Sequence, residues 1–208
     1  MLGIKDSKAE MNQTVFLVED DHSITEAIVD LFESAGIAVR CFSSAEEFLE
    51  GWSPELAGCL ILDVRLPGIS GMELQTKLVR EHFALPAIII SAHGDVPMVR
   101  RAFKTGAVEF LSKPFLDEDL LEAVRQAFAL DFERRSASDQ IAEVHSRIGS
   151  LKRREYEVAD LVTQGFTNRE IAEKLRLSIV TIKLYRKLAM EKMQVESLAD
   201  LVKIWGKQ

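Results

Sequence analysis

The run CLILDVRLPGISGMEL, residues 59–74, decides the fold, because it passes from an apolar strand through a carboxylate into a helix. Residues 59–62 are apolar without interruption, as expected of a strand covered on both faces of a parallel sheet. Asp63 comes directly after them, and an amphipathic stretch begins near Gly71. The run therefore predicts a β/α unit with an acid at the carboxyl end of its strand.

The same alternation of apolar runs and amphipathic stretches extends from Thr14 to about Leu130. It predicts strands at residues 14–18, 38–42, 58–62, 87–91 and 109–111. Helices are expected after Ser23, from a capping box at Ser43 to Glu46, near Gly71, near Val96 and after Leu116. Five such units predict an α/β fold with a doubly wound, five-stranded parallel sheet.

Polar residues gather where these strands end, which is the functional edge of a doubly wound sheet. They are Glu19 and Asp20 after the first strand, Asp63 after the third, Ser91 in the fourth and Lys113 after the fifth. Carboxylates that converge repel one another, and a shared Mg²⁺ ion with oxygen ligands relieves that repulsion. Alternatively, strand-end acids only cap helices, which is the interpretation we favour for Asp21.

Past Leu130 the strand pattern stops, and periodic helices follow. Residues 131–149 are polar, with apolar residues at helical spacing, and are expected to form a linker that is helical in part. Helices are predicted at residues 152–164, 168–175, 179–193 and 198–205. This pattern indicates a compact all-α module of four helices.

The two middle helices of this module carry clear local signals. Thr167 is expected to cap one helix with Glu170, and Ser178 to cap the next. A buried stripe is expected at Ile182, Ala189 and Met193, and a basic face at Lys183, Arg186, Lys187 and Lys192. Such a face is usually only solvated, but on a capped helix pair it favours DNA binding.

Charge and composition limit the classes of function. The net charge is −7, and residues 1–130 carry 11 basic against 21 acidic side chains, whereas residues 131–208 carry 15 against 12. An acidic chain is not expected to bind nucleic acid in general, but its positive minority segment can carry a local phosphate-binding surface, and charge alone leaves this undecided. A signal peptide and an apolar run of membrane-spanning length are not expected, and Cys41 and Cys59 are expected to be free, buried thiols in the cytoplasm.

The strings VFLVEDD (15–21), AIIISAHGDV (87–96) and GAVEFLSKPF (106–115), together with the opening run, resemble the successive motifs of CheY-like receiver domains over about residues 12–130. The resemblance implies that Asp63 is the phosphoacceptor. It also implies Mg²⁺ (or Mn²⁺) bound by Asp20 and Asp63 directly, by Glu19 through water, and by the main-chain carbonyl of Arg65. Glu19 stands where the family commonly has Asp. Ser91 and Lys113 would contact the phosphoryl group, Phe110 would be the switch aromatic, and a cis bond would precede Pro114.

Residues 151–193 resemble the helix-turn-helix of the LuxR/NarL class, especially its FixJ branch. The resemblance implies base contacts from Lys183, Leu184 and Lys187. It implies phosphate contacts from Asn168, Arg169, Thr181 and Arg186. Tyr185 and Leu188 replace a histidine and an asparagine that are usual in the family.

Together these resemblances imply a cytoplasmic, phosphorylation-activated transcriptional regulator of a two-component system, not an enzyme. It comprises a receiver domain (12–130), a helical linker (131–149) and a DNA-binding domain (150–208). Its expected partners are a sensor histidine kinase, double-stranded promoter DNA, a second copy after phosphorylation, and RNA polymerase, but no membrane.

Two alternative functions stay open. A metal-dependent phosphatase could also work through an aspartyl phosphate, although Arg65 stands where the haloacid-dehalogenase type has a second acid. A regulator that acts without phosphorylation would not need the intact acidic site.

Overall fold

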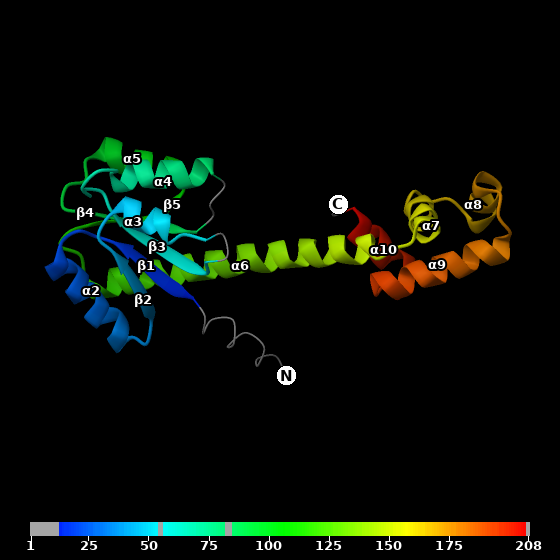
Figure 1. Ribbon diagram of the computed structural model, residues 1–208, viewed down its shortest axis with the longest axis horizontal. Helices are drawn as coiled ribbons and strands as arrows, with labels where there is room; N and C mark the ends of the chain where they lie inside the picture. Colours follow the sequence, from blue (N-terminus) through cyan, green and yellow to red (C-terminus); the bar gives the residue numbers. More distant parts are fainter. Residues whose placement is uncertain (1–12, 54–55, 82–84, 207–208) are drawn as a thin grey trace. The chain divides into compact units, whose positions relative to one another are not determined.

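The computed structural model describes residues 13–53, 56–81 and 85–206. The chain divides into two compact units, with the boundary between Arg134 and Arg135 (Figure 1). Among the described residues, no helix is long and apolar enough to cross a membrane.

The first unit is built on a sheet of five parallel strands in the order β2-β1-β3-β4-β5. The strands are β1 (Thr14–Val18), β2 (Ala38–Phe42), β3 (Gly58–Asp63), β4 (Ala87–Ser91) and β5 (Ala107–Ser112). Val18 pairs with Leu62, and Asp63 pairs with Ile90, so the carboxyl ends of the central strands lie at one edge. The predicted fold class is confirmed, and β5 is longer at both ends than predicted.

Helices cover both faces of the sheet (Figure 1). They are α2 (His22–Ser34), α3 (Ala45–Glu50), α4 (Gly71–Arg80), α5 (Val96–Lys104) and α6 (Asp117–Gly149). On one face, Phe32 of α2 and Val124 of α6 pack against the central strands. On the other face, the apolar sides of α3, α4 and α5 are buried, with Phe48 and Leu74 fully enclosed.

The capping box predicted at Ser43 was wrong by one residue. Ser44 is the N-cap of α3, and its side chain accepts a hydrogen bond from the Glu47 backbone N–H. The Glu47 carboxylate in turn accepts hydrogen bonds from the N–H and hydroxyl of Ser43. Two adjacent serines and two adjacent glutamates allow two registers of the cap, and α3 adopts the second.

Helix α6 runs unbroken through the stretch that was expected to be only partly helical. Within it Asp131 is fully buried, and its carboxylate accepts a hydrogen bond of 2.9 Å from the Gly58 backbone N–H. Gly58 has a φ of 135°, and a Cβ there would lie 1.9 Å from the Thr14 carbonyl oxygen, so only glycine fits. Asp131 therefore ties α6 to the start of β3.

The second unit contains the end of α6 and four further helices. These are α7 (Arg153–Thr163), α8 (Asn168–Leu175), α9 (Ile179–Met193) and α10 (Leu198–Trp205). Thr167 and Ser178 cap α8 and α9 as predicted. The apolar sides meet in one cluster that includes Ile171, Ile182 and Leu201, each of them fully buried.

The two cysteines differ, which corrects the prediction that both are buried. Cys59 is fully enclosed in β3, and burial, with a smaller contribution from Asp131, raises the pKa of its thiol. Cys41 is exposed, because it lies in β2, the outermost strand beside β1.

Candidate functional site

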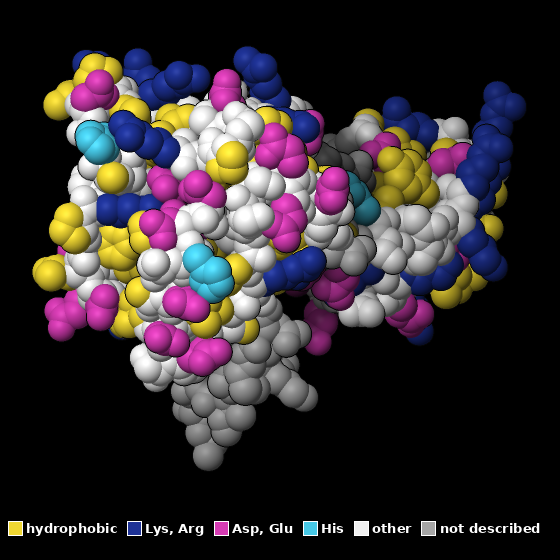
Figure 2. Space-filling view, turned by 60° about the vertical axis from the view of Figure 1, so that its left-hand side comes forward, with side chains coloured by type: hydrophobic (Ala, Val, Ile, Leu, Met, Phe, Trp, Pro, Cys, Tyr) yellow, Lys and Arg dark blue, Asp and Glu magenta, His cyan; other side chains and the backbone are white. Residues whose placement is uncertain are grey.

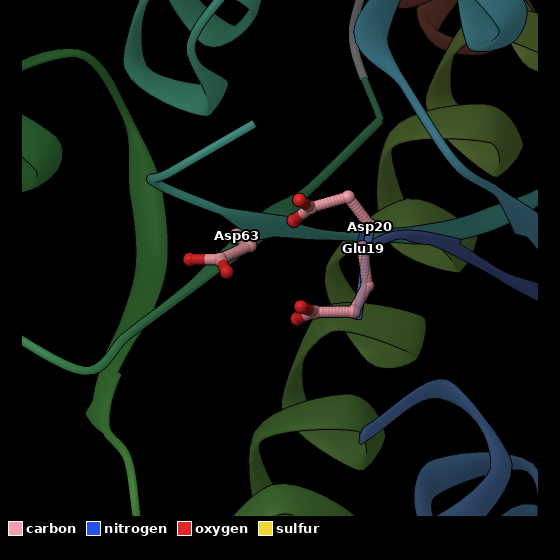
Figure 3. Close-up of side chains that lie close together, drawn as sticks. All are labelled: Glu19, Asp20 and Asp63. Carbon is pink, nitrogen blue, oxygen red and sulfur yellow. The ribbon is translucent and has the colours of Figure 1, made fainter. Parts of the chain in front are cut away.

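Three carboxylates converge at the carboxyl edge of the sheet (Figure 3). Glu19 and Asp20 directly follow β1, and Asp63 ends the neighbouring strand β3. One oxygen from each residue lies within 4.8 Å of the others. Glu19 and Asp63 are buried, whereas Asp20 is exposed and gives the cluster access to solvent.

Lys113 binds two of these carboxylates. Its Nζ lies 2.5 Å from Glu19 Oε2 and 2.9 Å from Asp63 Oδ2. Lys113 follows β5, and its peptide bond to Pro114 is cis, as predicted. One ammonium compensates one negative charge, so three ionised carboxylates leave an excess of two. An excess of this size suits a divalent cation with oxygen ligands.

Burial and neighbouring charges have opposite effects on the pKa values of Glu19 and Lys113. Burial raises the pKa of Glu19 more than its hydrogen bond to Lys113 lowers it, and the nearby Asp63 charge raises it further. Burial alone would lower the pKa of Lys113, but its bonds to the two carboxylates hold that pKa above its ordinary value. The Lys113 amine is therefore protonated and positively charged at neutral pH.

The backbone beside Asp63 is closely packed. The Arg65 backbone N–H donates to Asp63 Oδ1 at 3.2 Å, while the Arg65 side chain is exposed. A Cβ on Gly71 would lie 2.1 Å from the Asp63 carbonyl oxygen, so glycine lets the start of α4 approach the site. The expected role of the Arg65 carbonyl as a metal ligand stays a prediction.

Ser91 and Phe110 lie on adjacent strands. Ser91 is buried at the end of β4, where its hydroxyl donates to the His93 carbonyl at 2.8 Å. Phe110 is half-buried in β5, and its ring would lie 2.6 Å from a Cβ on Gly94. Among the described residues, the Ser91 hydroxyl bonds to the His93 backbone and not to Asp63.

The residues expected to bind DNA lie on α8 and α9. In Figure 2, Lys and Arg side chains gather along one edge of the helical unit, at the right of the view. Lys183, Leu184 and Lys187 are exposed on α9. Arg186 and Asn168 join α9 to α8 through a side-chain hydrogen bond of 3.3 Å.

The other two expected phosphate contacts also have partners within the unit. Arg169 lies 3.6 Å from Glu173 in an exposed ion pair. The hydroxyl of Thr181 lies 2.7 Å from that of Ser178, the N-cap of α9. The structure thus brings all seven expected residues onto this pair of helices.

Lys192 does not belong to the basic face, which corrects the prediction. Its Nζ lies 2.6 Å from Glu155 Oε2 and donates to the Ser150 carbonyl. Glu155 is only 3% exposed and also accepts from the Lys152 backbone N–H. The Lys192 hydrogen bond lowers the pKa of Glu155. Sequence reasoning placed Lys192 on the basic face because Glu155 lies 37 residues earlier and no local pattern pairs the two.

The family follows from comparison with known proteins. A family model described as a response regulator receiver domain matches residues 15–125, more than half of the chain. The chain belongs to the response-regulator family. A second model, of bacterial regulatory proteins of the luxR family, matches residues 149–205. This response regulator therefore carries a LuxR-type DNA-binding domain.

Relatives of this response regulator match it over nearly their whole length. It is 45% identical to nodulation protein W of Bradyrhizobium diazoefficiens over 95% of this chain and 87% of that protein. It is 38% identical to the transcriptional regulatory protein FixJ of Azorhizobium caulinodans over 91% of this chain and 90% of that protein. The resemblance to the FixJ branch and the assignment to two-component regulation are confirmed.

A solved structure has the same fold. The response regulator StyR superimposes with a TM-score of 0.88 at 44% identity, over 95% of this chain and all of the StyR chain. The sequence expectation of a five-stranded receiver followed by a helical domain is confirmed.

Proposed function

We propose that this response regulator is switched by phosphoryl transfer to Asp63 and then acts on promoter DNA through α9. The supporting observation is the buried Asp63 carboxylate, fixed 2.9 Å from the Lys113 ammonium beside two further acids. An Asp63 oxygen attacks the phosphorus of a phosphohistidine on a sensor kinase. The P–N bond breaks, the imidazole leaves, and an acyl phosphate forms.

The acidic cluster would hold one Mg²⁺ or Mn²⁺ ion. Asp20 and Asp63 are the proposed direct ligands, with Glu19 acting through water and Arg65 through its carbonyl. The uncompensated negative charge and the carboxylate oxygens fit such an ion. When bound, the ion offsets the charge of the phosphoryl oxygens as they approach the carboxylates.

Three residues would convert phosphorylation into a change of surface. The Ser91 hydroxyl exchanges its bond to the His93 carbonyl for a phosphoryl oxygen, and Lys113 pairs with the acyl phosphate. Phe110, now half-buried beside Gly94, moves inward as Ser91 shifts. This switch reshapes the surface formed by α5, β5 and the receiver part of α6, and drives homodimerisation.

DNA binding would divide between two sets of residues. Lys183, Leu184 and Lys187 contact base edges, whereas Asn168, Arg169, Thr181 and Arg186 contact phosphates. Two linked copies then bind half-sites about one helical turn apart. The proposed regulator also contacts RNA polymerase. It acts in the cytoplasm, and it regulates transcription without catalysing a reaction of its own. The proposed modules span residues 12–130, 131–149 and 150–208.

The test uses the full-length protein with a small acyl phosphate and Mg²⁺. One phosphoryl group per chain is expected, at an acid-stable and alkali-labile site, with dimerisation in the labelled sample by sedimentation. Asp63→Asn should abolish both, and Asp95→Asn, at the exposed N-cap of α5, should retain labelling. Labelling that survives Asp63→Asn would contradict the proposal. Steady turnover of the phosphodonor would favour the phosphatase alternative.

A further inference from the structure

Val180 is an apolar residue that core packing does not explain. It is the second residue of α9 and is 77% exposed. Ile182, Ala189 and Met193 form the inward side of this helix and are at most 1% exposed. At 3.6 residues per turn, Val180 lies about 160° around the helix from Ile182. Its side chain therefore points almost directly away from the core.

Val180 shares its side of the helix with the residues proposed to contact bases. Val180, Lys183, Leu184 and Lys187 follow the i, i+3, i+4, i+7 spacing of a single helical face. All four are exposed. This outer stripe joins two branched apolar side chains to two ammonium groups. No acidic residue occurs from Ile179 to Met190, so the stripe suits an anionic partner over this length.

DNA combines negative charge with an apolar group in its major groove. The C5-methyl of thymine is the apolar group on the base edges there, and Val and Leu side chains offer it van der Waals contact. The N-terminal residues of a recognition helix are those that contact base edges. Val180 stands at that end of α9, one turn before Leu184.

We propose that Val180 is a specificity-determining residue that contacts a thymine methyl in each half-site. The inference rests on the proposed function and extends it, because it names the base chemistry that the outer stripe selects. Lys183 and Lys187 bring charge complementarity to the same face. The half-site should therefore contain a thymine whose methyl group contributes to affinity only when Val180 is present.

The experiment removes the methyl from the DNA and the valine from the protein, separately and together. A duplex is selected from a random pool by the phosphorylated full-length protein. Each thymine is then replaced in turn by deoxyuridine, which keeps the hydrogen-bonding groups and lacks the methyl. At one position per half-site the wild type should lose about threefold to fivefold in affinity, the equivalent of one buried methyl. Val180→Ala should bind the thymine and uracil duplexes equally.

Controls separate this inference from the proposed function. Val79→Ala changes an exposed valine on α4 and should retain the full thymine preference. If the wild type selects a site that Lys183→Ala binds more weakly, the proposed function stands. The Val180 inference is then overturned by a selected site without thymine, or by equal thymine preference in wild type and Val180→Ala. Unchanged DNA binding with lost transcription in vitro would overturn it too, by indicating a protein partner.

Discussion

Two lysines show how differently the two units use charge. The Lys113 side chain is 12% exposed and contacts two carboxylates, at 2.5 and 2.9 Å. The Lys187 side chain is 74% exposed and lies 3.7 Å from Glu191 in an ion pair. Burial fixes the charges around Lys113, so they contribute to folding as well as to the proposed phosphoryl transfer. The Lys187 ammonium stays in water, where it can exchange its partner for DNA in the proposed complex.

The largest expected difference between the regions is in stability. Lys113→Met leaves Glu19 and Asp63 buried without a counterion, and should lower the free energy of unfolding of the receiver by about 3 kcal/mol at pH 7 without divalent cations. Lys187→Met should change stability by less than about 0.5 kcal/mol, because exposed ion pairs contribute little. Urea unfolding in the presence of EDTA measures the free energy of unfolding of both variants. Equal effects would break the comparison, and Mg²⁺ should recover part of the Lys113→Met loss.

The next prediction concerns DNA binding rather than folding, and here the exposed charges of α9 should matter more than the buried charges of the receiver. Lys183→Ala removes an exposed ammonium from α9 and should lose roughly 1 to 3 kcal/mol on the selected DNA, with relaxed preference at the contacted base. Its unfolding free energy should stay within about 0.5 kcal/mol of the wild type. Titration on selected and scrambled duplexes gives the answer. Equal losses on both duplexes would mean that Lys183 contacts only phosphates.

The sequence predicted the receiver fold and the convergence of its acids, because the signals for both are local. Apolar runs mark the strands, and the acids that follow the runs must meet once the strands are parallel neighbours, as Glu19 and Asp63 do. Asp131 was missed, because its buried partner Gly58 is 73 residues away and no local pattern pairs them. The position of Asp131 on the helix nevertheless pointed to burial, because it lies on the same helical face as the buried residues Val124 and Ala127.

The same limit explains the error at Lys192. Its charge and position along α9 resemble those of Lys183 and Lys187, and only the tertiary packing reveals that Glu155 of α7 holds it. Helix periodicity identifies the buried stripe, but it does not say which exposed-looking cation a neighbouring helix has already bound. On the outer stripe, by contrast, the ion pair of Lys187 is with Glu191 of the same helix, and the predicted DNA contacts there stay predictions.

Glu155 is a buried charge within the helical unit. It therefore tests whether burial, rather than membership of the receiver, makes the removal of a charge costly for stability. Its folded pKa is lowered by Lys192, so its stabilisation is present above its unfolded pKa of about 4.3 and is lost as the pH falls through the lower, folded pKa. Glu155→Gln should cost about 1 to 2 kcal/mol at pH 7, and this cost should shrink progressively as the pH falls below about 4.3.

Fluorescence of Trp205 during urea unfolding, in a Trp52→Phe background, follows the unit that contains Glu155. Glu196→Gln, at an exposed position between α9 and α10, is the control and should show little change at either pH. A Glu155→Gln effect that persists unchanged at pH 3 would indicate a packing role rather than a charge role.

The smallest expected effect belongs to Arg169, an exposed cation that lies 3.6 Å from Glu173 in the free protein. As a phosphate contact it should release about one counterion on binding, so Arg169→Ala should weaken binding to all sequences alike and flatten the slope of log affinity against log salt by about one unit. The substitution Arg169→Lys keeps the charge and should retain that slope. A salt titration on selected and scrambled DNA compares the variants. If Arg169→Ala instead loses affinity only on the selected site, α8 reads bases, and the division between phosphate contacts on one helix and base contacts on the other is wrong.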